Sequence, residues 1–163
     1  MTNSVLLLGS NVGDRQQHLT MAIAAISSAI GTIVQQSSIY ESEAWGNTEQ
    51  DPFYNQAIEV ATSLTPRQLL TAIHAIEAAQ GRVRSADEKW QPRTIDIDIL
   101  LYGEQSVQEK DLQIPHPELA NRNFALLPLM EILPELVHPT LQKPIDELYF
   151  DSKDTLEVIQ LEQ

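Results

Sequence analysis

Two aspartates within an alternating apolar segment are the residues of this chain whose types and spacing most directly suggest chemistry. The alternation puts Ile95, Ile97, Ile99 and Leu101 on one side and Asp96, Asp98, Leu100 and Tyr102 on the other. This is the period of a half-buried strand, on which the two carboxylates share a face with their Cα atoms about 6.7 Å apart. Such a pair can hold one cation or two neighbouring cations, and magnesium prefers oxygen ligands.

The segment that precedes these aspartates is basic. It contains four of the chain's ten lysines and arginines: Arg82, Arg84, Lys89 and Arg93. Arginine binds phosphate oxygens bidentately, and magnesium is usually held by one or two carboxylates together with substrate phosphates. The combination therefore indicates polyphosphate chemistry. A solvated strand face is the alternative for an Asp-x-Asp pair alone, but two like charges on a strand rich in Ile and Leu favour a nearby cation.

The elements that must position these residues follow a β-α-β-β-α-β order. The predicted strands are Ser4–Leu8, Thr32–Ser42, Ala57–Ser63 and Ile95–Leu101, and the predicted helices run from Asp14 to Gly31 and from a capping box at Thr65–Gln68 to Gly81. This order predicts an α+β, ferredoxin-like fold, in which an antiparallel sheet has two helices on one face and C-terminal additions follow. The other face would then be open for a site.

Three further segments contain candidate residues. The long connection Glu41–Asn55 is aromatic, and such loops are usually functional or disordered. On the second helix, His74 and Glu77 lie one turn apart and off the apolar stripe, so a solvated helix face is the favoured interpretation from the sequence alone. His116 stands between two prolines, where it could cap a helix, fill a surface niche or contact an anion.

Composition limits the classes of function. The chain has 163 residues, which indicates one domain, and a formal net charge of −13, which argues against nucleic-acid or membrane-surface binding. It has no cysteine, which excludes thiolate chemistry, and no apolar run long enough to span a membrane. We expect a cytoplasmic monomer with small-molecule partners, and a peripheral acidic tail over residues 151–163.

Several motifs together resemble the 6-hydroxymethyl-7,8-dihydropterin pyrophosphokinases of folate biosynthesis. These motifs are Leu8–Asp14, Phe53–Ala57, Ile76–Glu77 with Gly81–Arg84, Trp90–Asp98, Ile114–Pro117 and Arg122–Phe124. The resemblance covers the chain from about Ser4 to about His138. It implies that residues 1–163 form a single domain that transfers pyrophosphate from ATP to the pterin, giving AMP and the pterin diphosphate.

The resemblance also implies roles for individual residues. Asp96 and Asp98 would bind two Mg2+ ions, with Arg82, Arg93 and Asp98 acting in catalysis. Nucleotide contacts would come from His74, Glu77, Arg84, Trp90, Ile99, His116 and Arg122, of which Arg84 and Trp90 belong to a mobile lid. Phe53 and Phe124 would stack on the pterin and Asn55 would bind its edge, together with groups around Ser42, Glu43 and Trp45.

Two other classes of function remain as alternatives. A non-catalytic nucleotide-binding domain of the same fold would be expected to have lost at least one of Asp96, Asp98, Arg82 or Arg93, and all four are present. A metal-dependent phosphohydrolase would need a water-activating group near the phosphates and would lack a pterin pocket. Asn55 and its aromatic neighbours argue against this second alternative.

Overall fold

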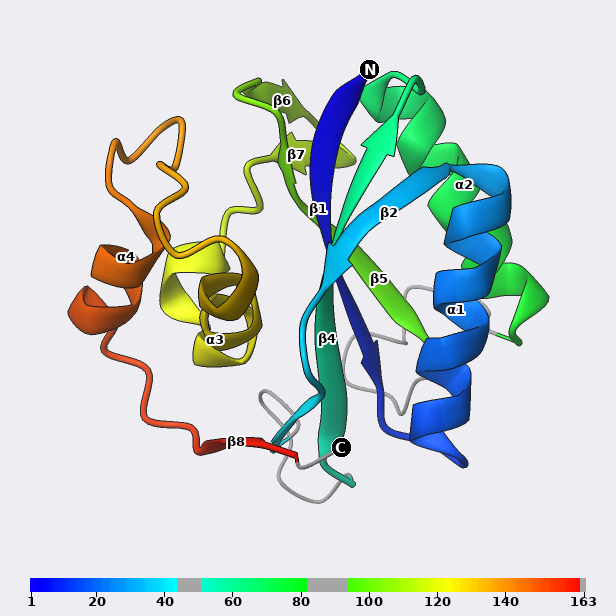
Figure 1. Ribbon diagram of the computed structural model, residues 1–163, viewed down its shortest axis with the longest axis horizontal. Helices are drawn as coiled ribbons and strands as arrows, with labels where there is room; N and C mark the ends of the chain where they lie inside the picture. Colours follow the sequence, from blue (N-terminus) through cyan, green and yellow to red (C-terminus); the bar gives the residue numbers. More distant parts are fainter. Residues whose placement is uncertain (44–50, 82–93, 162–163) are drawn as a thin grey trace.

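The fold is a curved antiparallel sheet between two layers of helices (Figure 1). The computed structural model describes residues 1–43, 51–81 and 94–161. Its strands are β1 (Thr2–Ser10), β2 (Gly31–Gln36), β3 (Tyr40–Ser42), β4 (Phe53–Thr62), β5 (Asp96–Tyr102), β6 (Val107–Glu109), β7 (Leu112–Ile114) and β8 (Val158–Gln160). Its helices are α1 (Arg15–Ala29), α2 (Pro66–Ala79), the short 3-10 helix η1 (Leu119–Asn121), α3 (Asn123–Ile132) and α4 (Ile145–Asp151).

The strand order confirms the ferredoxin-like fold. The main sheet runs β5-β1-β4-β3-β8, and β2 also pairs with β4. The predicted strand Thr32–Ser42 is therefore two strands, β2 and β3, which pair with successive parts of β4. They are separated at Ser37, whose hydroxyl accepts a hydrogen bond from the Ala57 N–H and so breaks the regular ladder.

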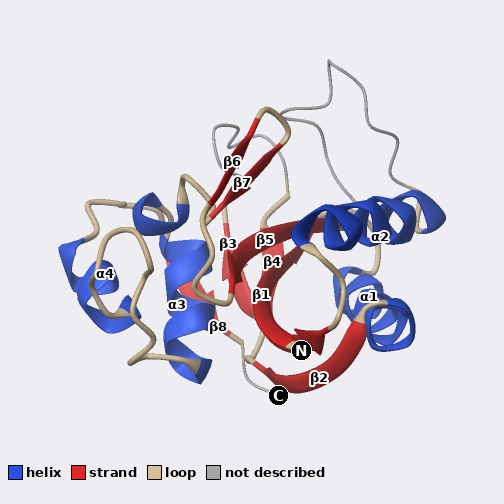
Figure 2. Cartoon of the chain, turned by 90° about the horizontal axis from the view of Figure 1, so that it is seen from above, coloured by secondary structure: helices blue, strands red, loops and turns tan. Residues whose placement is uncertain are grey.

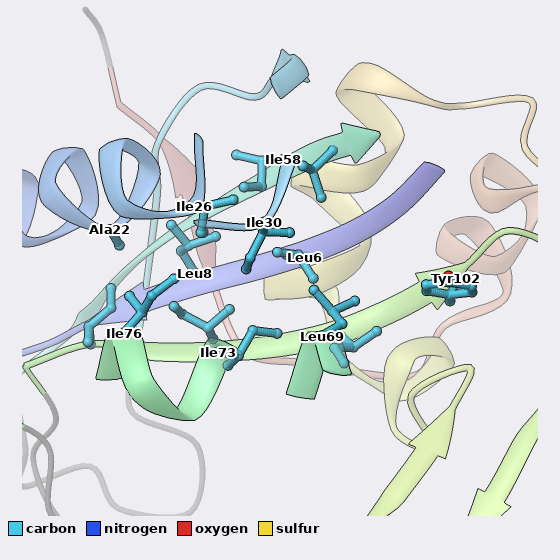
Figure 3. Packing of buried hydrophobic residues seen from close by; sticks show 14 of the residues in the cluster. Leu6, Leu8, Ala22, Ile26, Ile30, Ile58, Leu69, Ile73, Ile76 and Tyr102 are labelled. Atoms are coloured by element: carbon cyan, nitrogen blue, oxygen red, sulfur yellow. The ribbon is translucent and has the colours of Figure 1, made fainter. Parts of the chain in front are cut away.

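Helices α1 and α2 cover one face of the sheet because their apolar stripes complement it. Asp14 caps α1 by accepting a hydrogen bond from the Gln17 N–H, and Thr65 with Gln68 forms the predicted capping box of α2. Figure 3 shows the resulting core, in which Ile26 from α1 and Leu69 and Ile73 from α2 lie against β1 and β5. This packing fixes β5 on the sheet and therefore fixes the direction of its aspartates.

The opposite face is not fully open, contrary to our expectation. Viewed from above, α1 and α2 lie on one side of the sheet and α3 and α4 on the other (Figure 2). Residues of this second layer, such as Leu126 and Leu129, pack with Val5 and Leu7 of β1. The C-terminal additions are apolar on their inner side, so they cover part of this face and leave the site to the remainder.

A bulge in β5 corrects the predicted alternation. Ile99 pairs with Leu6 and Leu101 pairs with Val5, so Leu100 is an extra residue between adjacent positions of β1. A bulge reverses the side-chain parity beyond it. Leu100 and Leu101 therefore both pack beneath α3, and Tyr102 joins the α1 and α2 side, where its hydroxyl donates to the Leu64 carbonyl.

The C-terminal segment has a defined place in the fold. Strand β8 pairs antiparallel with β3 and forms one edge of the main sheet, as Figure 1 shows. The sequence pattern did not predict this strand.

Within the described ranges, no helix combines the length and the apolar character that crossing a bilayer requires.

Candidate functional site

Asp96 and Asp98 lie on the face of β5 that turns away from α1 and α2. Both side chains are half-buried, whereas Ile97 and Ile99 between and beyond them are buried in the core of the helix side. The alternation therefore brings the two carboxylates to one face, as predicted. This oxygen donor pair fits magnesium, which commonly takes one or two carboxylates and completes its shell with water and phosphate oxygens. Outside residues 44–50, 82–93 and 162–163, no cluster of three or more potential metal-binding side chains occurs.

Gly9 connects these aspartates to Asn55 across the sheet. It pairs with Asp96 on β5 and with Asn55 on β4. A Cβ atom at this position would lie 3.3 Å from Cδ1 of Phe53 and 3.4 Å from Oδ1 of Asn55. The absence of a side chain at Gly9 thus lets Phe53 and Asn55 approach the middle of the sheet, next to the acidic pair.

Asn55 is buried, and its amide has a fixed orientation. Its Nδ2 donates to the Ser42 hydroxyl at 2.8 Å and to the Tyr40 carbonyl at 3.4 Å. Because both bonds engage the amide nitrogen, Oδ1 is the atom that lies toward Gly9. The site therefore has a positioned hydrogen-bond acceptor on β4, supported by β3.

The prediction placed Phe53 and Asn55 in a loop, which is wrong. Strand β4 begins at Phe53, four positions before the predicted start at Ala57, because residues 53–55 pair with Ser42, Glu41 and Tyr40 of β3. These residues therefore have the regular alternation of a strand. Phe53 and Asn55 share the face that Asp96 and Asp98 occupy.

Asn11 and Arg15, which both follow β1, hold the segment that leads into β4. The sequence pattern predicted this role for neither of them. Asn11 Nδ2 donates to the Asp51 carbonyl at 3.2 Å, and Arg15 donates to the Pro52 carbonyl at 2.8 Å. The Arg15 guanidinium also lies 3.9 Å from the centroid of the Tyr54 ring, a cation–π contact. A basic residue at the first position of α1 was the only available signal.

His116 brings a neutral imidazole close to the acidic pair. The main-chain N–H of His116 donates to the Leu100 carbonyl at 3.0 Å, and the ring Nδ1 accepts from the Glu118 N–H at 3.1 Å. The single proton of the neutral ring is therefore on Nε2. Burial, together with the positive charge of Arg122, lowers the His116 pKa to about 4, although Glu118 and Asp96 oppose this shift. At neutral pH, His116 can thus donate a hydrogen bond from Nε2 without carrying charge.

Arg122 and Phe124 flank the start of α3. Phe124 packs partly buried against the core beneath α3, and the Arg122 guanidinium carbon lies 5.6 Å from the Phe124 ring centroid. The helix begins between them, at Asn123. One helix start thus provides both a cation suited to an anion and an aromatic ring suited to a flat ligand.

Glu77 is buried rather than solvated, which corrects the interpretation favoured from the sequence. Its side chain is on α2 and only 1% of its surface is exposed. Its Oε2 accepts from the Ile97 N–H at 2.9 Å, so it holds the free edge of β5 between the two aspartates. The pattern did not reveal this because the edge of β5 comes from a separate part of the chain. His74, one turn earlier, is half-buried.

The remaining candidates differ in how the structure places them. Ser42 is buried beside Asn55, and Glu43, which directly follows β3, is exposed. The Ile99 side chain belongs to the core against α1 and α2, so only its main chain could contact a nucleotide. Outside the described residues lie Trp45, Arg82, Arg84, Lys89, Trp90 and Arg93.

Comparison with known protein families gives one match over most of the chain. The family of 7,8-dihydro-6-hydroxymethylpterin-pyrophosphokinase (HPPK) matches residues 5–134. The chain is 42% identical to the 2-amino-4-hydroxy-6-hydroxymethyldihydropteridine pyrophosphokinase of Aquifex aeolicus, over 96% of this chain and 94% of that protein. It is 44% identical to the protein of the same name from Methylorubrum extorquens, over 84% of this chain and 86% of that one.

Solved structures share the fold at lower sequence identity. A crystal structure of HPPK-DHPS in complex with substrates superposes with a TM-score of 0.73 and 18% identity, covering 91% of this chain and 43% of that one. Wild-type HPPK-DHPS from Plasmodium falciparum superposes with a TM-score of 0.72 and 19% identity, covering 91% and 44%. The chain thus spans less than half the length of these solved chains.

Proposed function

Because the chain belongs to the HPPK family, we propose that it transfers pyrophosphate from ATP to 6-hydroxymethyl-7,8-dihydropterin, with AMP and the pterin diphosphate as products. The protein is a transferase of the pyrophosphokinase class in folate biosynthesis. The observation that supports the proposed reaction best is the row formed by Asp96, Gly9 and Asn55 on one face of the sheet. It places groups suited to a metal-bound phosphate beside a group suited to a heterocycle.

Asp96 and Asp98 would hold two Mg2+ ions together with the phosphates of ATP. When bound, these ions would neutralise phosphate charge and keep the triphosphate in place. Asp98 would also orient the pterin hydroxyl group for in-line attack on the β-phosphorus. Since transfer of a phosphoryl group requires little covalent help from the protein, positioning and electrostatic stabilisation would supply most of the acceleration.

The pterin would bind between Phe53 and Phe124. Two aromatic faces suit a flat heterocycle, and Oδ1 of Asn55 would accept a hydrogen bond from its edge. Ser42 holds the Asn55 amide in the orientation that this requires. Main-chain groups around Glu43 and Trp45 would complete the edge contacts.

The triphosphate would be bound from the side of His116 and Arg122. The neutral His116 can donate from Nε2, and Arg122 supplies positive charge at the start of α3. Arg82 and Arg93 would stabilise the transferring group. Further nucleotide contacts would involve His74, Glu77 and the main chain of Ile99, and a lid containing Arg84 and Trp90 would close to exclude water.

The organisation that fits this function is a single domain that acts as a cytoplasmic monomer. Residues 1–161, apart from the two undescribed internal segments, contribute to the main sheet, the helices on its two faces and the small β6–β7 hairpin. Light scattering during size-exclusion chromatography would test the oligomeric state, and a stable dimer would contradict this part of the proposal.

Product analysis would test the reaction. The protein is incubated with ATP, magnesium and 6-hydroxymethyl-7,8-dihydropterin, and the products are followed by phosphorus NMR. We expect AMP and pterin diphosphate to form in equal amounts. ADP or free phosphate would instead indicate a γ-phosphoryl kinase or a phosphohydrolase, and the absence of turnover would favour a nucleotide-binding domain.

A further inference from the structure

The segment that follows α4 contacts two separate elements of the proposed pterin site. After α4 the chain passes the start of α3 and then runs beside β3 as β8 (Figure 1). We call residues 152–161 the C-terminal strap. The strap lies beyond residues 5–134, which are the part of the chain that the family matches.

Asp154 of the strap caps α3. Its Oδ2 accepts from the Asn123 N–H at 2.8 Å, and its carbonyl accepts from the Asn123 Nδ2 at 3.3 Å. Arg122, which precedes the helix, makes no side-chain cap of its own. The first turn of α3 therefore obtains its capping carboxylate from the strap, and a negative charge is favourable at this end of a helix.

The Asp154 carboxylate is itself held in place. Its Oδ1 accepts from the Leu156 N–H at 3.0 Å, and the Asp154 N–H donates to the Ser152 hydroxyl at 3.2 Å. The two carboxylate oxygens thus bond to different segments, Oδ1 to the strap and Oδ2 to α3. This geometry fixes the start of α3 relative to the strap.

The far end of the strap is fixed to β3. Val158 pairs with Ser42 and Gln160 pairs with Tyr40, while the Leu161 N–H donates to the Ile39 carbonyl at 2.9 Å. Ser42 is the residue whose hydroxyl holds the Asn55 amide. The strap therefore links the helix start that carries Phe124 to the strand that supports Asn55.

We propose that Asp154 is a positioning residue for the pterin, acting by holding the first turn of α3 so that Phe124 faces Phe53 and Asn55 at the right separation. This inference rests on the proposed function. The effect should fall on Phe124 more than on Arg122, because the Arg122 N–H is also held by the Leu119 carbonyl of η1. Pterin binding should thus depend on Asp154 more strongly than ATP binding does.

The test compares the variants Asp154→Ala, Asp154→Asn and Asp154→Glu in the full chain. Dissociation constants for the pterin and for ATP with magnesium are measured separately by equilibrium titration. We expect Asp154→Ala to weaken pterin binding about five- to tenfold, the size of a lost helix cap, and ATP binding by less than about twofold. Asp154→Asn keeps an acceptor for the Asn123 N–H and should restore most of the affinity, whereas Asp154→Glu moves the carboxylate and should restore less.

A matched control is Asp151→Ala. Asp151 is exposed, lies three positions earlier and pairs with Lys143 at 3.2 Å, so its loss changes the net charge equally without touching α3. Hydrogen exchange at residues 123–126 supplies a readout that does not depend on activity. It should accelerate in Asp154→Ala and remain unchanged in Asp151→Ala.

Two results would overturn the inference alone. The first is that Asp154→Ala binds the pterin as tightly as the wild type does. The second is that this variant loses pterin and ATP affinity equally and in proportion to a lower melting temperature, since a merely structural role of Asp154 would produce that result. If the wild-type protein itself binds no pterin, the proposed function fails, and this inference fails with it.

Discussion

The two faces of the sheet differ in what they bury. On the face covered by α1 and α2, the strands contribute an apolar core that includes Leu6, Leu8, Ile58, Ile97 and Ile99. On the other face, the apolar residues Val5, Leu7 and Leu100 of the strands pack beneath α3 and α4. The same face also carries the polar residues Asp96, Asp98 and Asn55, which are the ones assigned to the site.

Residues that stabilise the fold and residues suited to the reaction therefore alternate along the same strands and lie on opposite faces. Because side chains alternate, Ile97 can anchor β5 in the core while its neighbours Asp96 and Asp98 face the site. The two charged aspartates on this edge strand lower the stability of the fold, and the apolar packing on the reverse side compensates for that loss. Substitutions on the site face should therefore reduce activity and change stability little, whereas substitutions on the helix-covered face should reduce stability and change activity little.

The largest effect is expected from Asp98→Ala on the site face. Removing this carboxylate should lower kcat/KM by about three orders of magnitude, which corresponds to about 4 kcal/mol of transition-state stabilisation. The free energy of unfolding should change by less than about 1 kcal/mol, since the side chain is only half-buried. Steady-state kinetics and urea unfolding measure both quantities. Near-normal activity would refute the proposed metal-binding role, and Asp98→Asn shows whether charge or size matters.

Leu8→Ala is the corresponding change on the helix-covered face. Leu8 is fully buried beneath α1 and α2, so its truncation should lower the free energy of unfolding by about 2–5 kcal/mol. The Michaelis constants should stay within about twofold of wild type at temperatures where the variant is folded. A selective rise in the KM for either substrate would show that the two faces are not independent.

Tyr40→Phe should lower the free energy of unfolding by less than Leu8→Ala does. It tests whether a hydrogen bond between β3 and α3 stabilises the contact of this helix with the sheet. The Tyr40 hydroxyl donates to Glu131 Oε1 of α3 at 2.7 Å; burial raises the Tyr40 pKa, and the nearby Glu131 raises it further. Loss of this bond should cost about 1–2 kcal/mol of unfolding free energy. The effect should be modest because Glu131 still accepts from the Ser38 N–H. Unchanged thermal and urea stability would show that this bond does not stabilise the contact between α3 and the sheet.

His138→Asn should produce the smallest change, in the pH dependence of stability. His138 is 5% exposed, burial lowers its pKa, and its Nδ1 accepts from the Thr140 and Leu141 N–H groups. Its folded-state pKa is below the unfolded value of about 6.5, so stability is fully present above that pH and decreases as pH falls.

Asparagine can replace the Nδ1 acceptor but does not titrate. The decrease in unfolding free energy between about pH 7 and pH 5.5 should therefore be smaller in His138→Asn than in the wild type. It should not vanish, because His116 also has a lowered pKa and contributes with the same sign. Urea unfolding at both pH values provides the measurement, and identical slopes would contradict the prediction.

The sequence by itself determined those features that depend on neighbouring residues. The capping box at Thr65, the cap at Asp14 and the apolar stripe of α2 all follow from local chemistry, and the structure contains them. The order of elements was enough to predict the ferredoxin-like sheet. The alternation in β5 correctly placed Asp96 and Asp98 on one face because that period is a property of the strand itself.

Only the tertiary structure decided features that depend on pairing between distant segments. The bulge at Leu100 arises from the register with β1, the early start of β4 from pairing with β3, and the burial of Glu77 from its contact with the edge of β5. The cap that Asp154 provides to α3 joins residues 31 positions apart. No local period encodes such contacts, because the free energy of burial and hydrogen bonding that selects them exists only once both segments are in place.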